Sequence, residues 1–377
     1  MSVRKVTWTN KNGKPSERWL VDYVDQDGAR CAKNFKGKKE ADLYHAQVNV
    51  EVAQGTHTAP SKSPTIAEAA EKWLQRIEAR KRERSTLRQY QQHRDHIVKR
   101  IGSVKLAQLT PSRVEDFRDK LQLELSRPLA RKVLTSFKSI LKVNKRSHVA
   151  ADISIERDKR EEHVEVGRDL PSNAEVKRLI EAVKGDDPRA ARMRALLLTA
   201  AFAGLRASEL RGLRWEDLDM KAAVLQVRQR ADRYNKIGKL KSAKSRRTIP
   251  LDTANLLPAL RQWQMASEYK NGLVFPTSTG AVEHHKNMVR SLEPVMKAAK
   301  VFNKDGKPKY ALHAFRHYFA SWCLNTESRG GLGIPPQDVQ RLLGHSSIVM
   351  TLDVYGHLFP GGDHHSKFAA GTRAIFA

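Results

Sequence analysis

The sequence predicts a mainly α-helical protein with small β elements, arranged as successive units along the chain. Three observations lead to this prediction. Alternating apolar residues and hairpin-type turns are confined largely to the first 60 residues. Amphipathic patterns with N-terminal capping residues, typical of helices, fill most of the remainder. Two short apolar strands, beginning near Val224 and Thr248, add a small sheet to the last and largest unit.

Residues 1–60 are expected to form a three-stranded β unit followed by a helix. Asn12-Gly13 is a strong two-residue hairpin signal between the strands that begin at Val6 and Trp19. A third strand and a helical pattern follow. The segment from Gln54 to Pro64 is rich in Gly, Thr, Ser and Pro, a composition typical of a linker.

Residues 65–148 carry the patterns of four amphipathic helices, which predict a compact bundle. Thr65 and Glu68 have the spacing of a capping box, in which each side chain satisfies an amide at the helix start. Ser85 is expected to cap the second helix and Thr110 the third. Apolar density falls from about Ser147 to Arg168, which favours a linker.

Residues 169–362 are expected to form the largest unit, and 363–377 a C-terminal tail. Ser172 is placed to open its first helix. The apolar run at 195–205 is too short to cross a bilayer and is interpreted as a buried helix. Two predicted strands joined by a long basic segment complete a unit that is otherwise helical.

The charge of the chain indicates a polyanionic partner. Lys and Arg total 69 and Asp and Glu 41, which gives 69 − 41 = +28. Nucleic acid is the leading candidate, and a membrane surface or a solvated charged face is the alternative. The two cysteines, Cys31 and Cys323, do not form a disulfide framework or zinc-binding spacing. A cytoplasmic protein without a targeting segment fits this composition.

Basic side chains on the outer helix faces of the bundle are candidate contacts to DNA phosphates, with a solvated helix surface as the plainer interpretation. The candidate DNA-binding residues are Arg80, Arg82, Arg84, Arg131, Lys132, Lys138 and Lys142.

Four polar motifs in the last unit contain the candidate catalytic residues. Taken singly, each has an ordinary explanation, such as a helical ion pair, a charged hairpin or a surface His/Arg pair. In chain order the motifs supply Arg206 with Glu209, Lys241, His313 with Arg316, and His345 placed 355 − 345 = 10 residues before Tyr355.

In this order the four motifs resemble the catalytic domain of the tyrosine recombinases, the phage-integrase family, over roughly residues 170–360. The bundle at 65–148 resembles the core-DNA-binding domain of that family, and residues 1–60 resemble the arm-site-binding domain of its longer integrases. The resemblance implies a phage or mobile-element integrase that cuts and rejoins DNA through a 3′-phosphotyrosyl intermediate.

The resemblance also implies a catalytic role for each motif residue, and elementary electrostatics explains these roles. Charge that develops on phosphate oxygens needs fixed donors, and the planar guanidinium fork matches those oxygens. A phenol with a pKa near 10 needs a proton acceptor before it can attack. The implied roles are nucleophile for Tyr355, phosphate clamp for Arg206 and Arg316, third donor for His345, general base for His313, general acid for Lys241 and orientation of the site for Glu209.

Since arginines would supply the positive charge and a phosphotyrosyl ester would retain the bond energy, no metal, ATP or other cofactor is expected. Implied partners are double-stranded DNA with specific recombination sites, three further copies in a homotetramer that exchanges its C-terminal segments, and accessory DNA-bending or directionality proteins. The implied location is the bacterial nucleoid or a phage-infected cell, without a membrane partner.

Two alternatives remain. A type IB topoisomerase-like enzyme would share the chemistry, but it would not need the N-terminal β unit. A catalytically silent DNA-binding relative would keep the fold, but it would not need the complete set of motif residues.

Overall fold

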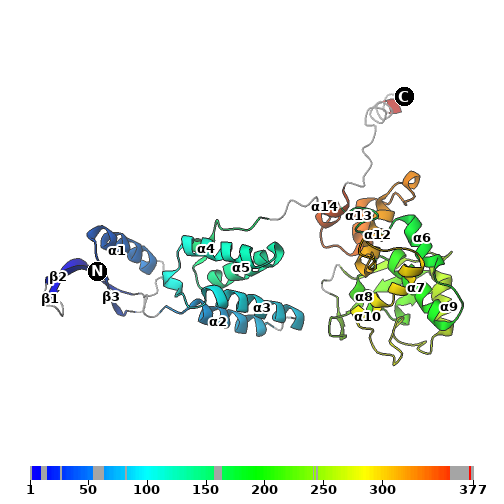
Figure 1. The fold of residues 1–377 in the computed structure, drawn as a ribbon, viewed down its shortest axis with the longest axis horizontal. Helices are drawn as coiled ribbons and strands as arrows, with labels where there is room; N and C mark the ends of the chain where they lie inside the picture. The colour runs from blue at the N-terminus through cyan, green and yellow to red at the C-terminus, as the bar shows by residue number, and fades with distance from the viewer. Residues whose placement is uncertain are drawn as a thin grey trace. The chain divides into compact units, whose positions relative to one another are not determined.

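The computed structural model describes residues 2–9, 15–25, 28–53, 63–80, 83–156, 164–240, 242, 245–356 and 373–374. The chain divides into two compact units, Met1–Asp158 and Lys159–Ala377. As expected, the fold is mainly helical with small antiparallel sheets (Figure 1). Among the described residues, no helix is long and apolar enough to cross a membrane.

The first unit begins with the predicted three-stranded sheet and helix. The elements are β1 (Ser2–Thr9), β2 (Pro15–Val24), β3 (Arg30–Phe35) and α1 (Lys38–Ala53). Both strand pairs are antiparallel, with β2 in the centre. Val21 and Tyr23 lie on the same face of β2, because alternate residues of a strand share a face. They pack with Ala41 and Val48 of α1 in a small core. The Asn12-Gly13 turn lies outside the described residues.

The rest of this unit is a helical bundle. Its helices are α2 (Ile66–Glu78), α3 (Arg84–Ile101), α4 (Pro111–Glu124) and α5 (Arg127–Val143), with a short 3-10 turn η1 (Leu106–Gln108). Phe117 and Phe137 pack in the core with ring centroids 4.8 Å apart and their planes tilted by 54°. The predicted capping box is confirmed: the Glu68 amide donates to the Thr65 hydroxyl, and the Thr65 amide donates to the Glu68 carboxylate.

Two local predictions for the bundle were wrong. Helix α3 begins at Arg84, so Ser85 lies within its first turn, and Glu83 occupies the cap position but makes no side-chain capping hydrogen bond. The linker predicted from Ser147 begins later, because Ile153 and Ile155 are buried in the bundle core. Val149 and Ala150, at the start of the same segment, are buried in that core as well.

The second unit is built around one apolar helix. Its helices are α6 (Asn173–Glu181), α7 (Pro188–Phe202), α8 (Ala207–Arg211), α9 (Leu256–Ala266), α10 (His285–Arg290), α11 (Glu293–Ala298), α12 (Leu312–Leu324), α13 (Pro336–Leu343) and α14 (Val349–Tyr355). The predicted buried helix is α7, which contributes the core side chains of Leu196, Leu197 and Leu198. Ser172 caps α6, as predicted.

The sheet of the second unit is small and antiparallel. It consists of β4 (Leu218–Asp219), β5 (Val224–Val227) and β8 (Arg247–Pro250). Leu225 pairs with Ile249, and both are fully buried. The basic segment between β5 and β8, where the sequence predicts only a long loop, contains a second hairpin, β6 (Gln229–Ala231) and β7 (Ile237–Lys239).

Candidate active site

The turn between α7 and α8 presents the first motif. Gly204 has a φ of +56°, and a Cβ there would collide with the Phe319 ring, so only glycine fits. The chain then turns so that Arg206 caps α8, and its backbone amide donates to the Glu209 carboxylate at 2.9 Å. The Arg206 guanidinium donates to the same carboxylate at 2.8 Å. Glu209 therefore fixes both the backbone and the side chain of Arg206.

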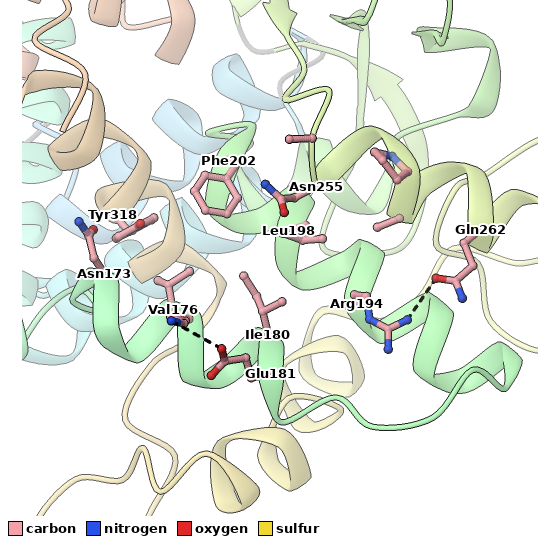
Figure 2. Close-up of a pocket in the computed structure, with 14 residues that line it drawn as sticks. Asn173, Val176, Ile180, Glu181, Arg194, Leu198, Phe202, Asn255, Gln262 and Tyr318 are labelled. Carbon is pink, nitrogen blue, oxygen red and sulfur yellow. Dashed lines mark hydrogen bonds and ion pairs between the residues drawn. The ribbon is translucent and has the colours of Figure 1, made fainter. Parts of the chain in front are cut away.

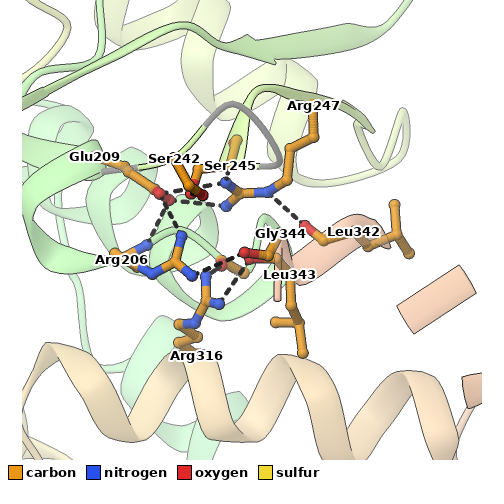
Figure 3. A network of polar contacts seen from close by, with 10 residues as sticks. Arg206, Glu209, Ser242, Ser245, Arg247, Arg316, Leu342, Leu343 and Gly344 are labelled. Carbon is orange, nitrogen blue, oxygen red and sulfur yellow. Dashed lines mark hydrogen bonds and ion pairs between the residues drawn. The ribbon is translucent and has the colours of Figure 1, made fainter. Parts of the chain in front are cut away.

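A second arginine reaches Glu209 from the sheet. Arg247 on β8 donates to both carboxylate oxygens, at 2.8 and 3.3 Å, and Glu209 is only 2% exposed (Figure 3). Burial alone would raise the pKa of Glu209, but the hydrogen bond and charge of Arg247, assisted by Arg206, hold that pKa below its ordinary value. The carboxylate therefore stays ionised between two cations.

Three arginines converge on the carboxyl end of α13. Arg247 donates to the carbonyl of Leu342 at 2.6 Å, Arg316 to that of Leu343 at 2.7 Å, and Arg206 to that of Gly344 at 2.9 Å (Figure 3). The last carbonyls of a helix lack intrahelical donors and carry partial negative charge. Three successive backbone groups thus anchor three guanidinium groups.

Positive charge is in excess at this point. Arg206, Arg247 and Arg316 contribute three charges and Glu209 offsets one, which leaves 3 − 1 = +2. Arg316 is buried, and it also donates to the Gly204 carbonyl at 2.6 Å. Burial, followed by the charges of Arg206 and Arg247, lowers the pKa of Arg316 to about 9. An anion placed here would relieve this repulsion.

A cavity of about 310 Å³ opens beside these side chains. Its lining includes Arg206, Ser242, Ser245 and Gly344. The two serine hydroxyls lie 3.0 Å apart. Lys241, the predicted general acid, lies outside the described residues, but Ser242, which follows it, lines the cavity.

Tyr355, the predicted nucleophile, ends α14 and is 2% exposed. Its ring packs with Phe319 and Leu343 in a cluster formed by α12, α13 and α14. Its hydroxyl lies 2.5 Å from Nδ1 of His317. Burial raises the pKa of Tyr355, and the charge of Arg316 partly opposes that rise.

The two predicted site histidines lie near the arginines. Partial burial, with the charges of Arg316 and Arg206, lowers the pKa of His313, although its side chain reaches solvent. His345 follows α13, and its Nδ1 lies 2.9 Å from the Thr351 hydroxyl. Burial and the charges of the three arginines lower its pKa to about 4, so His345 is neutral at pH 7.

The structure therefore brings Arg206, Glu209, His313, Arg316, His345 and Tyr355 into one region of the second unit. Sequence reasoning missed Arg247 and His317. Arg247 is two residues before the buried Ile249 in the same strand, so the two side chains lie on the same face of the sheet. His317 follows His313 by one helical turn and lies on the same face of the helix. The periodicity of the sequence could therefore have indicated both residues.

A larger cavity, about 740 Å³, lies elsewhere in the second unit and holds none of these residues (Figure 2). Val176, Ile180 and Leu198 give it apolar walls, and Arg194 at its rim donates to Gln262 at 3.1 Å. Among the described residues, no group of three or more His, Cys, Asp or Glu side chains could hold a metal ion.

Comparison with known families agrees with this geometry. The model of the phage integrase family matches residues 172–361, and that of the phage integrase N-terminal SAM-like domain matches residues 65–122. The chain belongs to the phage integrase family. It is thus a tyrosine recombinase, as the four motifs predicted.

Relatives of this integrase-family chain carry matching names. A tyrosine recombinase XerC-like protein of Caldanaerobacter subterraneus subsp. tengcongensis is 26% identical over 93% of this chain and 94% of its own length. An integrase of Streptomyces ambofaciens is 26% identical over 90% and 89%. The tyrosine recombinase XerC of Xanthomonas axonopodis pv. citri is 35% identical over 49% and 52%.

Solved integrase structures share the fold. The Tn1549 transposon integrase in complex with circular intermediate DNA matches with a TM-score of 0.63 and 19% identity, covering 82% of this chain and 99% of that one. A lambda integrase dimer bound to a COC′ core site matches with a TM-score of 0.56 and 16% identity, covering 92% and 93%.

The candidate DNA-binding residues of the bundle divide into two groups. Arg80, Arg84, Lys132 and Lys142 are exposed. Arg131 and Lys138 are half-buried and donate to the backbone carbonyls of residues 155 and 151, at 3.0 and 3.2 Å. Arg82 lies outside the described residues. Two of the seven candidates, Arg131 and Lys138, therefore already donate hydrogen bonds to the backbone that follows the bundle.

Proposed function

We propose that this integrase-family chain cuts and rejoins double-stranded DNA at specific sites, with Tyr355 as the nucleophile. The observation that carries the proposal is the cluster of three guanidinium groups beside a cavity, with a net charge of +2 and a buried tyrosine in the same unit. A scissile phosphate is an anion of the size and charge that such a cluster accommodates.

In the proposed reaction His313 accepts the phenolic proton of Tyr355 as the phenolic oxygen attacks the scissile phosphorus, and the 5′ oxygen leaves. Arg206 and Arg316 hold the non-bridging oxygens, because charge builds on these atoms in the transition state. His345 donates a third hydrogen bond to the same group, and Glu209 orients Arg206. Lys241 gives a proton to the leaving 5′ oxygen. The product is a 3′-phosphotyrosyl ester.

The proposed chemistry needs neither ATP nor a metal. The ester retains the energy of the phosphodiester, so the 5′-hydroxyl of a second strand can replace Tyr355 directly. The guanidinium groups supply the positive charge that Mg²⁺ supplies in other phosphoryl-transfer sites. Cleavage that proceeds in excess EDTA without nucleotide would support this part of the proposal, and cleavage restored only by Mg²⁺ would refute it.

The proposed assembly is a homotetramer on two DNA sites, joined by exchange of the segment that follows Tyr355. Support comes from a structure of similar fold that is described as a lambda integrase tetramer bound to a Holliday junction. The proposed further partners are accessory DNA-bending or directionality proteins. Residues 1–60 are proposed to bind distal arm sites, and the exposed basic residues of the bundle to bind core-site phosphates.

Covalent capture tests the proposed function without a target sequence chosen in advance. Tagged protein is expressed in bacteria, lysates are denatured in SDS, and DNA that stays attached to the protein is sequenced. The wild type should yield one enriched sequence and Tyr355→Phe none. A nicked duplex of that sequence, whose leaving strand diffuses away, then gives cleavage rates in vitro.

The same experiments separate the alternatives. Absence of any adduct from the wild type would favour the silent DNA-binding relative. Adducts spread over unrelated sequences, with relaxation of supercoiled plasmid and no strand exchange, would favour a type IB topoisomerase-like enzyme. Adducts that persist in Tyr355→Phe would refute the nucleophile assignment.

A further inference from the structure

The cavity beside the arginines extends away from the side chains assigned to the reaction. Among the predicted site residues that the structure describes, only Arg206 and Glu209 line it. Arg316, which is assigned to the phosphate clamp together with Arg206, does not. The rest of the lining is one arginine, four serines, a glycine and a methionine: Arg230, Ser208, Ser242, Ser245, Ser346, Gly344 and Met350. The cavity therefore begins at the Arg206 side of the clamp and continues beyond it.

The lining of this cavity has the composition of a phosphate-binding surface. Among its described residues the one carboxylate is Glu209, whose charge is already offset by Arg206 and Arg247. Serine hydroxyls donate hydrogen bonds to phosphate oxygens, and an arginine presents a planar fork of donors that matches those oxygens. Four hydroxyls and two guanidinium groups therefore line a space of about 310 Å³.

The strand that carries Arg230 is held against the helix that follows Arg206. A Cβ on Gly212, directly after α8, would lie 2.8 Å from the carbonyl carbon of Arg230, so β6 approaches this closely only because the residue is glycine. The Gln229 side-chain amide donates to the Gly212 carbonyl at 2.9 Å. Gly238 of β7 lies opposite Arg230 and has no side chain to compete for space. Helix α8 therefore fixes Arg230 relative to Arg206.

We propose that Arg230 binds the DNA phosphate next to the scissile one on the cleaved strand. This inference rests on the proposed function. A scissile phosphate held by Arg206 and Arg316 lies at one end of the cavity, because Arg206 lines the cavity and Arg316 does not. The strand that continues past Arg206 then brings its neighbouring phosphate to Arg230. The serine hydroxyls of the cavity supply further donors to the same group.

A contact to the neighbouring phosphate holds the strand in register with Tyr355. Such contacts fix the position of a protein on the duplex without reading the bases. Arg230 is only 8% exposed, so its side chain has little freedom left to lose when DNA binds. The neighbouring phosphate keeps its charge throughout the reaction, so the contact stabilises the bound substrate and the transition state alike. Loss of Arg230 should therefore weaken DNA binding more than it slows cleavage at saturation.

Removing the charge of one phosphate at a time tests this contact. A methylphosphonate replaces a single phosphate of the intact duplex, and gel shifts give the affinity in a Tyr355→Phe background, which prevents cleavage. At one of the two positions that flank the scissile phosphate, the methylphosphonate should weaken binding about tenfold. With Arg230→Met added, the same methylphosphonate should weaken binding by less than about twofold. Equal losses with and without Arg230 at both flanking positions, or coupling only at the scissile phosphate, would refute the proposal.

Arg228→Met is the matched control, because it also removes one positive charge but from an exposed side chain that does not line the cavity. It should keep the tenfold methylphosphonate effect, and loss of that effect would reveal a general charge effect and overturn the assignment. In Arg230→Met the slope of log affinity against log salt should become shallower by about 0.9. Melting temperatures report folding, and Arg230→Gln replaces Arg230→Met if the latter unfolds. The two proposals fail separately: no adduct from the wild type refutes the proposed function, whereas wild-type adduct without Arg230 coupling refutes only this one.

Discussion

Glu209 and Arg247 form a two-pronged ion pair in which both side chains are almost fully buried, at 2% and 5% exposure. Arg206 completes a bridge through the same carboxylate. Breaking a buried pair by removing one partner is strongly destabilising, because it leaves an uncompensated charge away from water. Glu209 therefore links the stability of the second unit to the geometry of the proposed phosphate clamp.

Glu209→Gln should weaken the fold in a pH-dependent way. The pKa of Glu209 lies below 4.5 in the folded protein, so its ionisation stabilises the fold above pH 4.5, and this contribution is lost as the pH falls through the folded pKa. The substitution should therefore lower the free energy of unfolding by about 3 kcal/mol at pH 7. Urea unfolding should show this difference shrinking below pH 4.5, and a difference constant with pH would contradict the ion-pair argument.

Arg247→Met should reduce both stability and cleavage. It removes the donor to the Leu342 carbonyl and one of the two cations at Glu209. Thermal melts should show destabilisation of about 3 kcal/mol, and the double variant with Glu209→Gln should be less destabilised than the sum of the two singles. Arg246→Met is the matched control, since the exposed neighbour should change stability by no more than about 0.5 kcal/mol.

Arg206→Lys should bind the recombination site almost as well as the wild type but cleave it about 100-fold more slowly. Lysine keeps the charge but cannot contact Glu209, the Gly344 carbonyl and a phosphate oxygen with one planar fork. The nicked duplex gives the rate and a gel-shift titration gives the affinity. Arg214→Lys, in an exposed pair with Glu216, should retain full activity. Equal cleavage by Arg206→Lys would refute the clamp.

Gly204→Ala should destabilise the second unit by about 2–5 kcal/mol, since it combines a strained positive φ with a clash against Phe319. It should also displace Arg316, which donates to the Gly204 carbonyl. Thermal melts and cleavage assays test both effects. Gly238→Ala, where an added Cβ meets no atom within 4 Å, should be nearly neutral. Comparable melting of the two variants would show that the turn adapts.

Deletion of residues 1–60 should leave core-site binding and cleavage intact while abolishing binding to distal arm sites. The sheet and α1 enclose a hydrophobic core of their own, separate from that of α2–α5. Footprinting of full-length and truncated protein on DNA that carries the complete recombination site distinguishes the two regions. Unchanged protection of the arm sites after deletion would remove the arm-binding assignment.

Features that depend on neighbours in sequence were predictable. The Thr65–Glu68 capping box and the start of α6 after Ser172 involve residues within one helical turn. The family motifs likewise pointed to residues that the fold gathers around α12 and α13. Ser85 was misplaced because the start of α3 has no side-chain cap to mark it.

Contacts across the fold were not predictable from spacing alone. Arg247 of β8 meets Glu209 of α8, 38 residues away, only because the tertiary fold brings the two elements together. His317 was on the correct helical face, but nothing local indicates that α14 brings Tyr355 onto that face. The linker after the bundle was predicted too long because Val149, Ala150, Ile153 and Ile155 pack into the bundle core.

The arginines are anchored by main-chain oxygens at the end of α13, and this has a consequence for how the site tolerates sequence change. Replacing the half-exposed Leu342 by another apolar residue leaves its carbonyl in place and keeps a side chain that can pack against the cluster around Tyr355. Inserting or deleting a single residue between Leu342 and Gly344 would change the spacing of these carbonyls, so they could no longer all meet Arg247, Arg316 and Arg206. The positions of the three arginines therefore depend more on the number of residues in this turn than on which side chains those residues carry.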